Sequence, residues 1–213
     1  RSDIRKEAEK FILTEREIGG TKVLAHELFT SGIGYLRVMF RTDHVPSRDL
    51  PYVGLLKAVL GFVDTTKHTY SDLSDEINLN TGGITISVSS YADSRKQGAF
   101  TGIFTASARV LCEKLDFGFS AIAEILLDSI LDDEKRLGEI VAETKSKSQM
   151  RLNQAAHSAA VMRASSYFSA ESAFDDCTGG IGFYQFLEET AKHFEEKKGE
   201  VIAKLKETAA RLF

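Results

Sequence analysis

The chain has 213 residues, of which 43% are apolar, and its 27 basic and 31 acidic side chains leave a formal net charge of −4. This composition suffices to bury a core without disulfides, and the lack of a basic block argues against nucleic acid as a partner. Because no apolar run approaches the roughly 20 residues that span a bilayer, and the charged residues 1–10 do not resemble a secretory signal, we expect a soluble protein of the cytoplasm or an organelle matrix with no membrane partner.

The first 20 residues are predicted to be a linker or N-terminal extension. Residues 1–16 are charged and permissive for helix, and Gly19-Gly20 interrupts the chain before a first β-like run at residues 22–28. The chain opens on Arg1 rather than on methionine and closes on a helical run at residues 204–213. We therefore expect a piece of a longer protein, with a linker at 1–20 and one αβ domain at 21–213.

Three segments show the period-2 alternation of strands with one buried face. They are residues 34–41, in which Met39 is the one apolar exception on the outer side, residues 84–89 and residues 104–110. Residues 93–98 predict a hairpin turn between the last two strands. The predicted apolar face of the sheet consists of Leu36, Val38, Phe40, Ile84, Ile86, Val88, Phe104, Ala106 and Val110.

Amphipathic spacing predicts helices around these strands. Apolar residues recur every three or four positions over residues 50–63, and Leu56 and Leu60 are expected to pack on the sheet. Thr69, as an N-cap with Asp72 three residues later, predicts a second helix that ends at Asn80, where Gly82-Gly83 would supply the C-cap. The rest of the chain predicts helices at residues 116–131, at 133 to about 169 with a break near residue 153, at 183–194 and at 195–212.

This order of elements predicts the fold class. Adjacent hairpin strands, followed by helices that must all cover one apolar face, favour an α+β fold with an antiparallel-rich mixed sheet covered by helices on one side. They argue against a doubly wound parallel sheet. The string Thr-Gly-Gly-Ile occurs at residues 81–84 and again at 178–181. A glycine pair before an apolar residue is typical of a helix stop, and a phosphate cradle is the remote alternative.

No reactive centre is visible in the sequence. The five histidines include no pair at the i, i+4 spacing of a zinc-binding helix, and no nucleophile or P-loop motif occurs. Cys112 and Cys177 form no CxxC and are expected to be buried small hydrophobic residues. Glu139 and Glu143 share a predicted helix face with basic neighbours, which favours a solvated, ion-paired surface.

Two neighbouring runs carry a resemblance to a known family. Residues 28–35 (LFTSGIGY) and 44–56 (HVPSRDLPYVGLL), continued by residues 80–84 and 148–153, resemble the third domain of presequence-protease-like peptidases of the pitrilysin/insulinase family. The resemblance covers the chain from about residue 20 onward. It implies a processing-peptidase-like metallohydrolase fold, in a parent protein whose four related αβ domains form two halves that close around an unfolded peptide.

The same resemblance implies that this domain is not catalytic. In the family, only the first domain binds zinc, through an HxxEH motif on the helix after its first hairpin, and a downstream glutamate is the third ligand. On the equivalent helix here, Tyr52 and Leu56 occupy the histidine positions and Leu55 the glutamate position. We therefore expect no catalytic residue, no bound metal and no cofactor in this chain, with zinc held by the first domain of the parent enzyme. Glu143 could echo the third ligand, but it would have no metal to complete.

The expected function is that of a chamber wall in a zinc metalloendopeptidase that degrades unfolded peptides, with the other domains of the same polypeptide as partners. A stand-alone binding or structural homologue, related to processing-peptidase subunits, is the alternative. The polar sheet face is the candidate for facing the chamber, although such a face can also serve solubility alone. Its residues are Tyr35, Arg37, Arg41, Thr85, Ser87, Thr105, Ser107 and Arg109.

Overall fold

The computed structural model describes residues 13–213, so that most of the predicted linker lies outside the described residues. The described chain opens with an antiparallel hairpin of β1 (Leu13–Ile18) and β2 (Thr21–His26). Gly19 and Gly20 connect the strands with φ of 57° and 80°, values that suit a two-residue hairpin turn. Residues 13–18 thus form a strand although their charge suggested a linker, because pairing with β2 gives a polar segment a partner. The domain boundary at residue 20 stays a prediction.

The main sheet has three antiparallel strands: β3 (Ile33–Arg41), β4 (Thr81–Ala92) and β5 (Phe100–Leu111). Their order is β3-β5-β4, so the last strand in the chain is central. The three predicted strands are confirmed, and so is the hairpin turn, where the Asp93 N–H donates to the Ala99 carbonyl at 2.8 Å. Val38 and Ile86 both lie opposite Ala106, which brings the predicted apolar residues to one face.

The described residues also form eight helices: α1 (Leu50–Val59), α2 (Tyr70–Asn80), α3 (Leu115–Leu127), α4 (Glu134–Gln154), α5 (Ala156–Ser165), α6 (Ala170–Gly179), α7 (Ile181–Lys192) and α8 (Phe194–Leu212). Short 3-10 turns, η1 (Ser47–Asp49) and η2 (Cys112–Lys114), precede α1 and α3. The Thr69 N-cap is confirmed, since its hydroxyl accepts the Asp72 N–H at 3.2 Å. The break near residue 153 is confirmed between α4 and α5, whereas α6 is a helix that the periodicity did not reveal.

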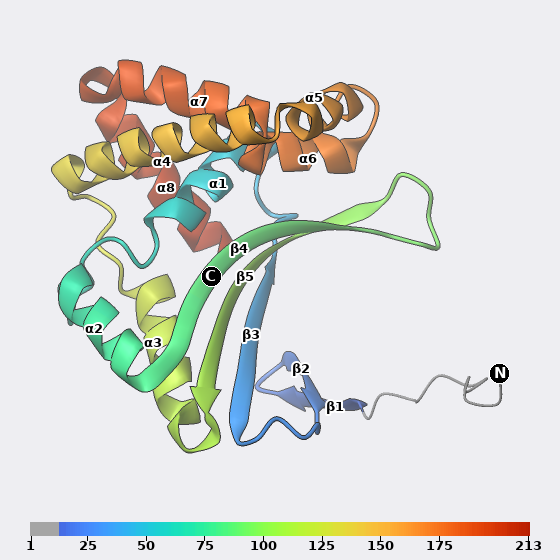
Figure 1. Ribbon diagram of the computed structural model, residues 1–213, viewed down its shortest axis with the longest axis vertical. Helices are drawn as coiled ribbons and strands as arrows, with labels where there is room; N and C mark the ends of the chain where they lie inside the picture. Colours follow the sequence, from blue (N-terminus) through green and yellow to red (C-terminus); the bar gives the residue numbers. More distant parts are fainter. Residues whose placement is uncertain (1–12) are drawn as a thin grey trace.

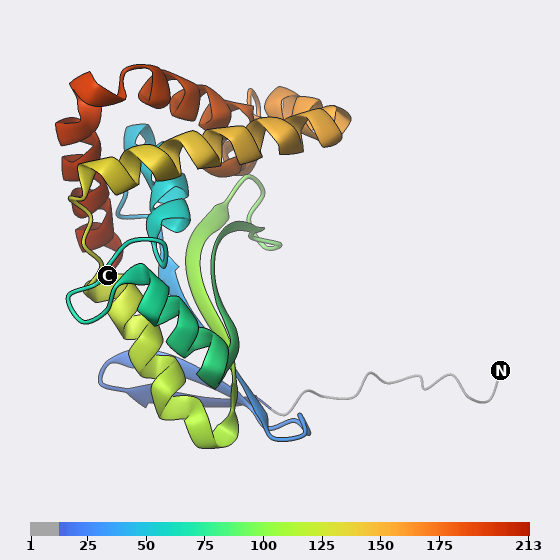
Figure 2. The same ribbon diagram turned by 60° about the vertical axis from the view of Figure 1, so that its left-hand side comes forward.

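Figures 1 and 2 show the sheet curving, with the helices on its convex side and no helix of residues 13–213 on its concave side. The fold is therefore the predicted α+β class. Phe104 is fully buried at the centre of the covered face, and its ring meets that of Phe213 at 5.5 Å between centroids. Leu56 and Leu60 are buried in the same core, as predicted, although α1 ends at Val59. The prediction for Cys112 is wrong: its side chain is exposed because the chain leaves the sheet at residue 111.

Candidate functional site

Helix α1 follows β3 and carries Tyr52, Leu55 and Leu56, the three positions compared with HxxEH in the sequence, and these residues serve packing. Leu55 and Leu56 are fully buried in the core. The half-buried Tyr52 ring packs edge-on against Phe186 of α7, with centroids 5.0 Å apart. Burial, and then the charges of Glu200 and Asp49, raise the pKa of the Tyr52 hydroxyl. A tyrosine that stays protonated and two leucines do not fit a zinc ion.

Gly54 shows how closely α1 is packed on its other neighbours. A Cβ at this position would lie 2.7 Å from the Thr178 carbonyl and 2.8 Å from the Phe183 ring. The helix is therefore pressed against the end of α6 and the start of α7, and only a glycine fits there. This face of α1 has no room for a ligand.

Residues 13–213 contain no group of three histidine, cysteine, aspartate or glutamate side chains that could hold a metal. Glu143, the residue that could have echoed a third zinc ligand, lies on the surface of α4 and pairs with Lys147 at 2.6 Å. This hydrogen bond and charge lower the pKa of Glu143. Glu139 pairs in the same way with Arg136 at 3.2 Å. The predicted solvated, ion-paired face is confirmed.

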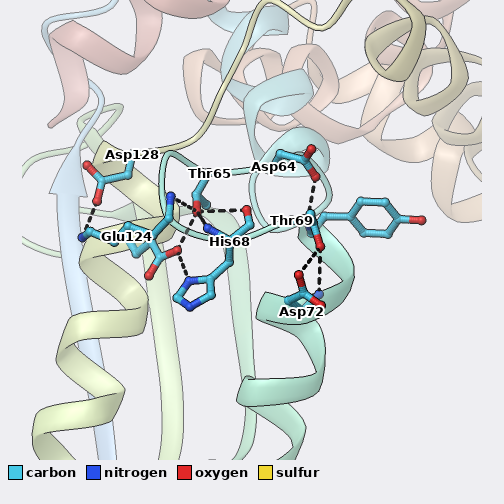
Figure 3. A network of polar contacts seen from close by, with 9 residues as sticks. Asp64, Thr65, His68, Thr69, Asp72, Glu124 and Asp128 are labelled. Atoms are coloured by element: carbon cyan, nitrogen blue, oxygen red, sulfur yellow. Dashed lines mark hydrogen bonds and ion pairs between the residues drawn. The ribbon is translucent and has the colours of Figure 1, made fainter.

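A buried polar cluster joins the loop before α2 to helix α3 (Figure 3). Glu124 is 7% exposed, and it accepts hydrogen bonds from the Thr65 hydroxyl at 2.6 Å and from His68 Nδ1 at 2.8 Å. Burial alone would raise the pKa of Glu124, but the bonds from Thr65 and His68 outweigh it and the pKa is lowered. The cluster resembles a catalytic triad only in composition. The hydroxyl donates to the carboxylate and not to the imidazole, so no base activates it.

A second buried carboxylate holds the corner between α6 and α7. Asp176, 1% exposed, accepts from Arg163 at 2.6 Å and from the Gly182 N–H at 3.2 Å. A Cβ at Gly180 would lie 2.6 Å from one Asp176 carboxylate oxygen, and a Cβ at Gly182 would lie 2.5 Å from the other. Both positions therefore require a residue without a side chain. The predicted helix stop at the second Thr-Gly-Gly-Ile string is confirmed, because α6 ends there at Gly179.

A cleft of about 530 Å³ lies between β4, α1, the α4–α5 junction and the end of α6. Lys57 Nζ bonds the Thr178 carbonyl at 3.4 Å, and Arg151 bonds the Gly179 carbonyl. Burial, and then the charge of Arg151, lower the pKa of Lys57. Both cations thus cap the negative end of α6. Because Asp175 also lines the cleft, the lining has no single charge sign that would select a ligand.

The eight polar residues named from the sequence lie together on the concave face of the sheet, opposite the helices. Cross-strand pairing links Tyr35 to Arg109, Arg37 to Ser107, and Ser107 in turn to Thr85. Tyr35 is 65% exposed. Thr105 differs from the other residues of this face because its side chain is buried, in the central strand between β3 and β4. The face therefore presents arginine, tyrosine and hydroxyl groups outside the helical layer.

The three arginines of this face differ in their partners. Arg41 is neutralised by Asp43, which lies 2.7 Å from its Nε and 2.5 Å from its Nη2. Arg109 Nη2 donates to the carbonyl of Gly82 at 3.0 Å, a neutral partner that leaves its charge uncompensated. Within residues 13–213, Arg37 has no ion-pair partner. Two of the three positive charges are therefore available to something outside the described chain.

Arg109 lies opposite a β-bulge. Thr81 pairs with Val110 and Ile84 with Ala108, so that Gly82 and Gly83 both oppose Arg109. Gly83 has φ of 106°, a conformation that glycine adopts at little cost. Helix α2 ends at Asn80 as predicted, but the prediction that Gly82-Gly83 caps it is wrong, because Thr81 is the C-cap residue. Strand β4 begins directly at Thr81, whose hydroxyl donates to the Ile77 carbonyl and accepts the Gly83 N–H.

Comparison with known proteins identifies the family. Residues 1–189 match the family described as Peptidase M-16C associated. The chain belongs to this peptidase-associated family. It is 33% identical to Protein HypA of Clostridium perfringens over 99% of the chain and 22% of that protein. It is 30% identical to the mitochondrial presequence protease of Yarrowia lipolytica over 84% of the chain and 18% of that protein.

A third relative extends the comparison to plants. The chain is 26% identical to presequence protease 1, chloroplastic/mitochondrial, of Arabidopsis thaliana over 96% of the chain and 19% of that protein. The chain thus spans about one fifth of the length of the curated relatives that it matches. The resemblance to the presequence-protease branch that residues 28–35 and 44–56 predicted is confirmed. Among the helices within residues 13–213, none combines the length and the hydropathy that crossing a membrane requires.

Proposed function

We propose that this domain forms part of the wall of the closed chamber of a zinc-dependent metalloendopeptidase that degrades unfolded peptides, and that it performs no catalysis itself. The observation that carries the proposal is the contrast between two surfaces. Helix α1 packs Leu55 and Leu56 into the core, and the family resemblance aligns these two residues with the zinc motif of the catalytic domain. The polar sheet face on the other side has no helix of the described chain over it, and it is the surface that an extended peptide could contact (Figure 2).

The relatives support the same function. Two of them are named presequence proteases, and the chain matches about one fifth of each. Other domains of the same polypeptide are therefore its proposed partners, and unfolded peptides its proposed substrates. Zinc would belong to the first domain of the parent enzyme, since Tyr52, Leu55 and Leu56 do not fit it here. The names of these relatives include mitochondria and chloroplasts, and we propose an organelle matrix or the cytoplasm as the compartment.

The coding sequence around this domain separates the proposed function from a stand-alone binding homologue. The chamber-wall function requires an HxxEH motif in the same polypeptide, N-terminal to residue 1. A polypeptide without that motif, and without peptidase activity, would favour the stand-alone homologue.

Photo-cross-linking tests which face meets the peptide. The experiment uses the longer polypeptide, inactivated by Glu→Gln in its HxxEH motif. In one variant a photoreactive amino acid replaces Thr85 on the concave sheet face. In the other it replaces Lys135 on the surface of α4. We expect a bound unfolded peptide to cross-link from position 85 and not from position 135. Binding of the peptide without any cross-link from position 85 would contradict the proposal.

A further inference from the structure

Among residues 13–213, Arg37 and Arg109 of the concave sheet face have no carboxylate partner, whereas the third arginine of that face, Arg41, pairs with Asp43. Asp43 holds Arg41 through two guanidinium nitrogens, and such a pair presents little net charge to a ligand. The Gly82 carbonyl occupies one N–H of Arg109, while an arginine has five N–H donors. The sequence pattern grouped the three arginines together, but the structure shows that Arg41 has a carboxylate partner and that Arg37 and Arg109 have none among the described residues.

The register places these two arginines next to each other. Arg37 of β3 lies opposite Ser107 of β5, and Arg109 stands two residues further along β5 on the same face. Diagonal neighbours on adjacent antiparallel strands have Cα atoms about 7–8 Å apart, which long side chains can bridge. Tyr35, directly opposite Arg109, adds an exposed phenol on the same side. Two guanidinium groups and a hydroxyl thus share one face of the sheet. The Arg109 guanidinium leans toward Gly82 of β4, on the other side of β5 from Arg37, so a carboxylate between β3 and β5 is reached by both arginines when Arg109 exchanges the Gly82 carbonyl for it.

The bulge in β4 helps to position Arg109. Its guanidinium reaches over Gly82 to that residue's carbonyl, and a Cβ at Gly82 would lie 3.4 Å from the Arg109 Cβ. A Cβ at position 82 would thus be in ordinary van der Waals contact with Arg109, which places Gly82 directly beneath that side chain. Bulges often re-aim a side chain, and here the Arg109 side chain lies over Gly82 of the bulge. The Thr81–Ile84 string follows the end of α2 at Asn80, as predicted, and also forms the bulge opposite this arginine.

We propose that Arg37 and Arg109, with Tyr35, form a subsite that binds the aspartate or glutamate side chain of an extended peptide. The inference rests on the proposed function, because it requires the peptide to lie on this face. Charge complementarity selects the occupant: a carboxylate accepts paired N–H bonds from arginine, whereas a lysine or arginine of the peptide would be repelled. The hydroxyl groups of Thr85 and Ser87, on β4 of the same face, can bond the peptide backbone beside the acidic residue.

The test uses two fluorescent, C-terminally amidated unfolded peptides that differ only by Glu→Gln at their acidic positions. Their binding to the inactivated longer polypeptide is measured by anisotropy. We expect the Glu peptide to bind about five- to tenfold more tightly than the Gln peptide, the order of magnitude of a charge-assisted contact. The double variant Arg37→Gln/Arg109→Gln should abolish this preference and leave binding of the Gln peptide unchanged. Salt should reduce the preference of the parent protein.

Two further variants serve as controls. Arg48→Gln, in η1 with a side chain 83% exposed, removes the same charge from the turn before α1 and should keep the preference for the Glu peptide. Arg37→Lys/Arg109→Lys keeps the charge but loses the paired N–H geometry, and it should retain part of the preference. Thermal melting of each variant verifies that it is folded.

Three outcomes would overturn the subsite. The first is a double Gln variant that keeps the full preference for the Glu peptide. The second is a preference lost equally in Arg48→Gln, which would show a general charge effect. The third concerns the C-terminus of the peptide. If the parent protein prefers a peptide with a free C-terminus over its amidated form and the double Gln variant loses that preference, the arginines bind the terminal carboxylate. In each case a cross-link from position 85 would leave the chamber-wall function standing, whereas its absence would overturn that function itself.

Discussion

The two sides of the three-stranded sheet differ in whether their charged groups have partners within the chain. In the helical layer, buried carboxylates have partners from the chain itself: Glu124 bonds Thr65 and His68, and Asp176 bonds Arg163. On the concave face, Arg37 and Arg109 are left without a carboxylate in the described part of the chain. A polar group buried by the fold must be satisfied by the fold, because leaving it unpaired is costly. A charged group that the fold leaves uncompensated is free to bind something else.

The largest effect should come from the covered face. Phe104→Ala removes a fully buried ring from the centre of the core, and we expect it to lower the free energy of unfolding by about 3–5 kcal/mol. Ser107→Ala, on the same strand but on the concave face, should cost less than about 0.5 kcal/mol. Chemical denaturation of the two variants compares the faces. A cost below about 1 kcal/mol for Phe104→Ala would mean that the wrong face has been assigned to the core.

The bulge should give the next largest effect. Gly83→Ala places a side chain at φ of 106°, with no neighbouring atom within 4 Å of the new Cβ. The cost is therefore conformational, about 1–3 kcal/mol. Because the bulge also positions Arg109, the same variant should weaken the preference for the Glu peptide. Denaturant melts and the anisotropy assay measure the two consequences, and unchanged stability would show that the bulge relaxes without strain.

The Glu124 cluster predicts a smaller, pH-dependent effect. The pKa of Glu124 is lowered in the folded state, so its stabilisation is present above the pKa of the unfolded chain and is lost as the pH falls through the folded pKa. Glu124→Gln should cost about 1.5–3 kcal/mol at pH 7, the range of hydrogen bonds to a charged group. The difference between parent and variant should shrink below pH 4. A difference that stays constant from pH 7 to pH 3 would contradict an ionised Glu124.

The smallest effect on stability should come from Asp43→Asn, which removes the partner of Arg41. The pair is exposed, so its loss should change the free energy of unfolding by less than about 1 kcal/mol. The released guanidinium should raise the affinity for the Glu peptide by about twofold at low salt. The anisotropy assay checks this expectation. A reduced affinity would mean that Asp43, rather than Arg41, is the group that the peptide contacts.

Local patterns in the sequence determined much of the fold. The alternation of Leu36, Val38 and Phe40 with polar neighbours assigned two faces to β3, because successive side chains of a strand point to opposite sides. Thr69 and Asp72 marked the start of α2 through a bond that spans three residues. The mismatch of Tyr52, Leu55 and Leu56 with HxxEH likewise needed no coordinates. Each of these inferences rests on residues that are close in the chain, where geometry follows from backbone periodicity.

Only the tertiary structure decided the rest. The central position of β5, and with it the placement of Arg37 beside Arg109, depends on pairing between segments some 70 residues apart in the sequence. Glu124 meets Thr65 across 59 residues. The first Gly-Gly string became a bulge and the second a helix end, because Arg109 faces one pair and Asp176 packs against the other. Identical local sequences took different structures since strand register and burial, which are set by distant residues, outweigh a local preference of about 1 kcal/mol per residue.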